Sequence, residues 1–306
     1  MSNYRILSLD GGAVRGVYTS VLLQKLVEAV PELVEKADLI AGTSSGGILG
    51  MGLAAGKTPA ELTDFWLQHV HSIFSRSWLG KIFNPWGIFW AKYDNRELRE
   101  AVGALFGERR LGELSKRVLV PTFDLDNEGK KRARQWKPKF FHNLDEQDPD
   151  FQQPIADVAV RTSVGPVYFP SFQGYVDGGV VANNPSMAAL AQCLHEELGK
   201  QKVDNVALLS IGAGANYEYL RGERHNWGFL RWSKRYVRLS IDGTMGVADY
   251  QCQRLLRDRY HRLAPELPKP IGFDDVSKTE DLMRWASEGE AARETKKAVV
   301  WLKQNW

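Results

Sequence analysis

Short apolar runs alternate with longer amphipathic stretches along this 306-residue chain. The apolar runs predict strands at residues 4–9, 36–40, 117–123, 140–141, 174–177 and 203–211. Stretches with apolar positions three or four residues apart predict helices at about 17–30, 45–55, 59–70, 95–106, 155–162, 185–198, 236–259 and 278–302. Strands that alternate with helices favour an α/β fold with a mostly parallel central sheet sandwiched by helices.

The turn between the second predicted strand and its helix is built around one serine. It reads Gly42-Thr43-Ser44-Ser45-Gly46, which is a G-x-S-x-G pattern. Glycines at both ends let the neighbouring strand and helix approach, and the turn then exposes the central hydroxyl above the sheet edge. Ser44 is therefore a candidate nucleophile. A tightly packed turn, or a phosphate cradle at the helix start, remains an alternative.

The first strand also ends in a glycine-rich loop, Asp10-Gly11-Gly12-Ala13-Val14-Arg15-Gly16. Such a loop leaves backbone N–H groups that can hold an anion, either a phosphate or a tetrahedral oxyanion. It lacks the Gly-Lys-Ser/Thr ending of a Walker loop, and Ala13 replaces the third glycine of a dinucleotide fingerprint. Because parallel strands end at one edge of a sheet, we expect this loop and Ser44 to share that edge.

A serine nucleophile needs a base. Asp177, beside Gly178 and Gly179, follows a short apolar run and is one candidate. A late histidine, His225 or His261, is the other, but neither follows an apolar strand as a triad histidine should. The pattern therefore favours a Ser–Asp dyad. An α/β-hydrolase-type esterase with a Ser–Asp–His triad stays open, as does a nucleotide- or phosphate-binding module that uses the two glycine loops.

Charge and cysteine content restrict the class of protein and the cellular compartment. The chain has 40 basic and 37 acidic residues, a net charge of +3, which argues against a dedicated nucleic-acid binder. Cys193 and Cys252 are far apart and match no disulfide or zinc pattern. We find no signal-peptide pattern and no apolar run of the ~20 residues that a membrane span needs. These features predict a cytoplasmic protein.

Two segments combine aromatic and basic residues. Residues 74–93 carry large aromatics at irregular spacing, which predicts either a small satellite core or a lid over the active edge. Residues 217–238 contain five Arg, one Lys and two Trp, as in a solvated face or a surface that meets lipid phosphate. Since no linker or firm boundary is evident, we predict one domain over 1–306. Its motifs lie within 4–214, and 215–306 form a mostly helical extension.

Taken together and in order, the Gly-rich loop, the Ser44 turn, Asp177-Gly178-Gly179 and Ala182-Asn183-Asn184-Pro185 resemble the patatin-like phospholipase family. The resemblance implies a three-layer fold and hydrolysis of acyl esters of phospholipids or other lipids, without a metal or other cofactor. It also implies a peripheral membrane contact and leaves room for a small-molecule or protein activator.

Carried over by position, the resemblance makes Ser44 the nucleophile and Asp177 the base. It assigns the remaining roles to an oxyanion hole at Gly11, Gly12 and Ala13, fixed by Arg15, to elbow glycines Gly42 and Gly46, and to supporting residues Asp10, Gly16, Gly178 and Gly179. The family usually has glycine where Ala13 stands. We therefore expect a working hole whose backbone must tolerate a Cβ at that position.

Overall fold

The computed structural model describes residues 4–76, 84, 89–129, 133–216, 219–222 and 224–306. Within them lies a seven-stranded sheet in the order β4-β3-β2-β1-β6-β7, with β5 paired to β3. Its strands are β1 (Tyr4–Leu9), β2 (Leu39–Gly42), β3 (Arg117–Asp124), β4 (Lys137–His142), β5 (Tyr175–Asp177), β6 (Val206–Ile211) and β7 (Tyr260–Leu263). The strands from β3 to β7 in that order are parallel to their neighbours, whereas β4 and β5 run antiparallel to β3. The predicted α/β class with a mostly parallel sheet is confirmed.

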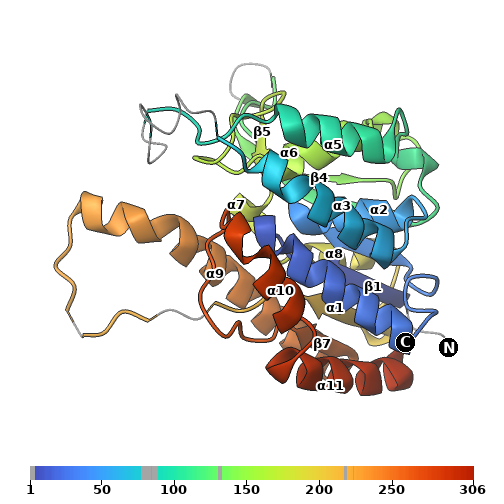
Figure 1. Cartoon of the computed structure of the whole chain (residues 1–306). Helices are drawn as coiled ribbons and strands as arrows, with labels where there is room; N and C mark the ends of the chain where they lie inside the picture. The colour runs from blue at the N-terminus through green and yellow to red at the C-terminus, as the bar shows by residue number, and fades with distance from the viewer. Residues whose placement is uncertain (1–3, 77–83, 85–88, 130–132, 217–218, 223) are drawn as a thin grey trace.

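Helices cover both faces of this sheet (Figure 1). They are α1 (Gly16–Ala29), α2 (Ser45–Ala54), α3 (Pro59–Ile73), α5 (Arg96–Phe106), α6 (Ile155–Ser163), α7 (Gly179–Ala182), α8 (Ser186–Leu194), α9 (Phe229–Leu256), α10 (Thr279–Trp285) and α11 (Gly289–Asn305). Within the described part of the chain, no helix is both long and apolar enough to cross a bilayer.

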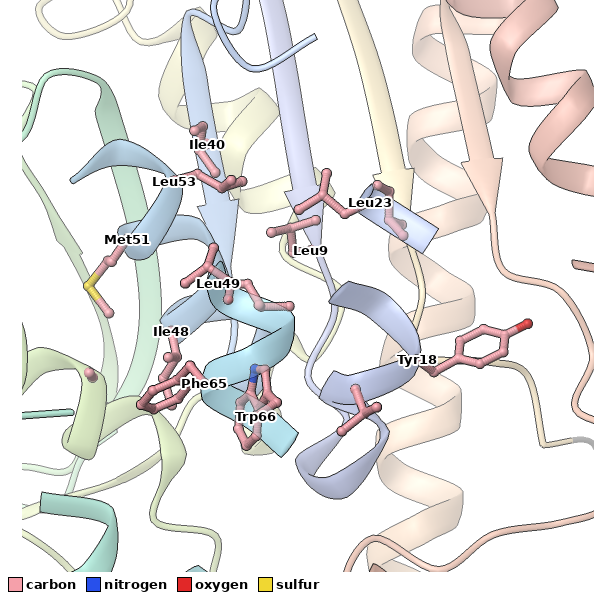
Figure 2. Close-up of a cluster of buried hydrophobic side chains, with 14 of the residues drawn as sticks. Leu9, Tyr18, Leu23, Ile40, Ile48, Leu49, Met51, Leu53, Phe65 and Trp66 are labelled. Atoms are coloured by element: carbon pink, nitrogen blue, oxygen red, sulfur yellow. The ribbon is translucent and has the colours of Figure 1, made fainter. Parts of the chain in front are cut away.

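Alternation along the strands produces the two hydrophobic layers. In β1, Leu7 and Leu9 face a core shared with α1, α2, α3, α5, α6, α10 and α11. Tyr4 and Ile6 face a smaller core shared with α8 and α9. Figure 2 shows the larger core, where Leu9 and Ile40 of the sheet meet side chains of α1, α2 and α3. Both sides of β1 are buried, as a central parallel strand requires.

Several predicted bounds were wrong. The helix predicted for 185–198 ends at Leu194, so His195 lies just past it, and the helix predicted for 236–259 spans Phe229–Leu256. The helix predicted for 278–302 is two helices, separated by a break at residues 286–288, and the second helix begins at Gly289, whose φ is +56°. Strand β7 was missed because its four residues include the polar His261 and Arg262, which break the apolar run.

Most of the aromatic segment at 74–93 lies outside the described residues, so the lid hypothesis is not tested there. Its two ends belong to the main core: the rings of Phe74 and Tyr93 lie 5.5 Å apart, and both contact Phe169. Close to the second end, Phe89 and Trp90 are 77% and 55% exposed. The described residues therefore combine a packed base with exposed aromatic side chains.

The pairing of β3 sets up the candidate site. Its first residues pair with β2, and further along the same side it pairs with β5, where Thr122 is opposite Asp177. Because Ala41 is opposite Leu119, continuing that parallel register by three residues brings Ser44 level with Thr122. Ser44 and Asp177 are therefore brought together by sharing one neighbour strand, although 133 positions separate them.

Candidate active site

Ser44 sits on a sharp turn between β2 and α2. Its backbone has φ of 54° and ψ of −123°, a conformation that non-glycine residues rarely adopt and that is typical of functional sites. A Cβ on Gly42 would lie 2.2 Å from the Gly46 carbonyl oxygen, and a Cβ on Gly46 would lie 2.4 Å from the Leu9 carbonyl oxygen. Both glycines are thus required by close backbone contacts.

The strained turn is held by hydrogen bonds from other elements. The Ser44 N–H donates to Thr162 Oγ1 (3.0 Å), whose hydroxyl donates to the Pro121 carbonyl (2.6 Å). The Thr43 hydroxyl donates to the Ala182 carbonyl (2.7 Å). The last turn of α6 and the short helix α7 therefore both hold the Ser44 turn in place. In the sequence, Thr162 was notable only as the end of a helix.

The carboxylate of Asp177 accepts a hydrogen bond from the Ser44 hydroxyl. Ser44 Oγ donates to Asp177 Oδ2 at 2.8 Å, and the Gly179 N–H donates to Asp177 Oδ1 at 2.7 Å. Burial raises the pKa of Asp177 to about 6, although the bonds from Gly179 and Ser44 oppose the rise. The carboxylate is thus ionised at neutral pH, yet its pKa is close enough to accept a proton from a reacting hydroxyl.

The Gly-rich loop lies beside this pair. Gly12 and Ala13 line the same cavity as Ser44, and Ala13 has φ of 51°. The Gly12 N–H donates to Ser45 Oγ at 3.0 Å. The Gly11 N–H donates instead to the Asn183 carbonyl (3.0 Å), and the Asn183 side chain donates back to the Gly11 carbonyl (3.1 Å). The peptide at Gly11 is therefore engaged in holding the loop.

Arg15 anchors the end of this loop and is only 6% exposed. It donates to the Gly214 carbonyl (3.1 Å), and its guanidinium lies 4.7 Å from the centre of the Phe273 ring. Burial, together with the nearby Arg238, lowers the pKa of Arg15 to about 10, so the guanidinium stays charged at neutral pH. Arg15 thus links the end of the loop to the backbone at Gly214 and to the Phe273 ring.

The C-terminal region also contacts the loop, which the motifs did not indicate. The Phe273 carbonyl accepts the Val14 N–H at 3.1 Å. At the start of the loop, Arg262 of β7 donates to both carboxylate oxygens of Asp10, one of them at 2.9 Å. Phe273 and Arg262 lie in stretches without a recognisable pattern, so sequence reasoning missed both of them.

A cavity of about 400 Å³ opens over Ser44 and Asp177. Most of its lining is apolar and includes Ile48, Trp66, Ile73, Phe74, Leu98 and Phe169. Ile48 and Trp66 belong to the core shown in Figure 2. Residues Tyr236, Val237, Ser240 and Ile241 of α9 line it too. Such a cavity suits a hydrocarbon chain attached to a polar reacting group.

The candidate histidines lie elsewhere. His261 stacks on Trp301 with ring centres 5.6 Å apart, and His225 lies 4.6 Å from Trp227. Neither lines the cavity.

Among the described residues, one group could hold a metal ion, namely His142, Asp148 and Asp150. It is also away from the cavity, and Lys139 lies 2.6 Å from the Asp150 carboxylate. Within the part of the chain that the structure describes, the Ser44 hydroxyl donates its hydrogen bond to Asp177, and neither histidine lies at the cavity.

Comparison with known proteins supplies the family context. The profile described as patatin-like phospholipase matches residues 7–190. The chain is similar to Protein teg of Priestia megaterium, with 33% identity over 75% of this chain and 69% of that protein. It is also similar to the cGAMP-activated phospholipases of Pseudomonas aeruginosa (30% identity, 90% of this chain, 83% of that one) and Vibrio cholerae (32% identity, 68% and 63%).

Proposed function

The chain belongs to the patatin-like phospholipase family, and from this premise we propose that it is a lipid acyl hydrolase of phospholipase A type. The observation that carries the proposal is the 2.8 Å hydrogen bond from Ser44 Oγ to Asp177 Oδ2 at an apolar cavity. Its substrates are phospholipids or other acyl-ester lipids presented at a membrane surface. No metal or other cofactor takes part in the steps that we propose.

In the first step, Ser44 Oγ attacks the carbonyl carbon of the ester while Asp177 takes its proton. The oxyanion that forms is stabilised by the amides of Gly12 and Ala13 and by the N-terminal end of α2. Because the Gly12 amide donates to Ser45 Oγ when substrate is absent, the oxyanion competes for that bond. The tetrahedral intermediate collapses, and the leaving alcohol takes the proton from Asp177.

In the second step, water attacks the acyl-enzyme. Asp177 removes a proton from the water, the carbonyl oxygen returns to the same amides, and Ser44 leaves with that proton while the fatty acid is released. The apolar lining over Ile48, Trp66 and Phe169 would hold the acyl chain during both steps. This lining also argues against the phosphate-binding alternative, because a phosphate needs charged or polar partners around it.

A mass-spectrometric survey of a mixed phospholipid extract tests the proposal. We expect wild type to release free fatty acids and lysophospholipids, and Ser44→Ala to release neither. A fluorophosphonate should label wild type at Ser44. Because two relatives are named cGAMP-activated phospholipases, the survey is run with and without cGAMP to detect a triggered enzyme. Failure of wild type under both conditions, together with no labelling of Ser44, would sink the proposal.

The pH dependence of hydrolysis follows from Asp177. Since burial raises its pKa to about 6, the basic form predominates above that pH and is lost below it. We expect kcat/KM for a soluble short-chain ester to be level above pH 7 and to fall roughly tenfold per unit below pH 6. Circular dichroism over the same range controls for unfolding. A rate that stays level down to pH 4.5 would contradict Asp177 as the base.

A further inference from the structure

We propose that the N-terminal half of α9, residues 229–241, is a docking surface for anionic phospholipid bilayers. This inference rests on the proposed lipid hydrolase function and names the surface through which the enzyme reaches its substrate. Figure 1 shows this part of α9 extending outward from the body of the molecule. It lies outside the residues matched by the family profile, which end at 190.

One side of this helix carries exposed apolar residues. Phe229, Tyr236 and Leu239 are 83%, 66% and 53% exposed, and with Trp232 they are spaced three or four residues apart. On an α-helix this spacing aligns them in one stripe. Exposed large apolar side chains in a row are costly in water and mark a surface that meets an apolar phase. The stripe is therefore a candidate for insertion below lipid headgroups.

Positive charge flanks the stripe. Residues 229–241 contain four Lys or Arg and no Asp or Glu. Arg231 and Arg235 are exposed, and Arg235 lies 4.9 Å from the centre of the Trp227 ring. An amphipathic helix with Trp and Phe on one side and Arg on the other is typical of helices that lie in the membrane interface. Each such cation attracts anionic lipid, so the positive charge favours an anionic bilayer over a neutral one.

The same helix leads to the reacting groups. Tyr236, Val237, Ser240 and Ile241 line the cavity over Ser44, while Phe229 and Arg231 lie one to three turns further out. Tyr236 belongs to both the apolar stripe and the cavity lining, so the stripe meets the cavity at this residue. A bilayer that holds the stripe would present its acyl esters at the cavity mouth. The docking surface and the candidate site are one connected feature.

Vesicle co-sedimentation of the full chain tests this surface. We expect wild type to bind vesicles of phosphatidylcholine with phosphatidylglycerol, more weakly at high salt, and to bind pure phosphatidylcholine poorly. Arg231→Glu/Arg235→Glu should weaken binding at least about tenfold, and Phe229→Ser should weaken it at both salt levels. Arg293→Glu/Lys296→Glu on α11 makes the same charge change on another part of the surface and should bind like wild type.

Hydrolysis assays on vesicles and on a soluble ester distinguish failure of the docking surface from failure of the proposed lipid hydrolase function. The α9 variants should lose activity on vesicles and keep wild-type rates on a soluble short-chain ester, because none of their substituted residues lines the cavity. If wild type hydrolysed neither substrate, the proposed function would fail while vesicle binding still tested the surface. Equal binding by wild type and Arg231→Glu/Arg235→Glu, equal binding to neutral vesicles, or self-association without vesicle binding would each overturn the inference.

Discussion

Asp177→Asn is expected to lower kcat/KM for ester hydrolysis by about 10³-fold or more. The amide of Asn cannot take the Ser44 proton, although it has nearly the shape of the carboxylate. Its oxygen can still accept the Gly179 N–H, which now donates to Asp177 Oδ1, so the turn should keep its structure. Most of the loss should appear in kcat, because Asp177 acts on the reacting hydroxyl rather than on the acyl chain. Steady-state kinetics with a soluble ester measure this split.

Three control variants accompany Asp177→Asn. Asp204→Asn makes the same chemical change at a carboxylate whose side chain is 90% exposed, and it should retain full activity. His225→Gln and His261→Gln should also retain activity, because neither imidazole lines the cavity. If either histidine variant lost as much activity as Asp177→Asn, a Ser–Asp–His triad would replace the dyad. Fluorophosphonate labelling of Ser44 should slow in Asp177→Asn alone.

Most of what the sequence could predict about the site came from its glycine-containing turns. Gly42 and Gly46 mark the elbow because their backbones touch neighbouring elements, and that requirement is local. The position of Asp177 was harder to predict. It depends on β5 pairing with β3 beyond the end of β2, and three residues are too few for a clear strand pattern. The flanking glycines pointed to Asp177 in the sequence, whereas only the sheet register explains why its carboxylate lies beside Ser44.

The supports of the Gly-rich loop could not be predicted from any motif. Asn183 was visible as part of a helix cap, yet its two hydrogen bonds to Gly11 are long-range contacts. Ala13 adopts φ of 51°, a value that glycine reaches without strain, so the chain tolerates a Cβ where the family usually has none. Phe273 and Arg262 reach the loop from the C-terminal extension. That extension therefore supplies two of the contacts that hold the loop.

A buried ion pair at the start of the loop provides the largest expected effect on stability. Asp10 is 1% exposed, and its carboxylate accepts two hydrogen bonds from Arg262 of β7. Burial raises the pKa of Asp10, and the facing guanidinium opposes that rise. Removing the cation alone leaves a buried, uncompensated carboxylate. We expect Arg262→Gln to lower the free energy of unfolding by about 3–5 kcal/mol at pH 8, as measured by urea denaturation.

The double variant Asp10→Asn/Arg262→Gln decides between a paired charge and simple packing. With both charges removed, no buried ion remains, so the double variant should recover most of the loss and lie within about 2 kcal/mol of wild type. The deficit of Arg262→Gln should also shrink at pH 5. There the unpaired Asp10 carboxyl, whose pKa in the folded state is raised above its unfolded value, binds a proton and loses its charge. A double variant as unstable as Arg262→Gln, with no difference between the two pH values, would show that Arg262 contributes through packing rather than through charge.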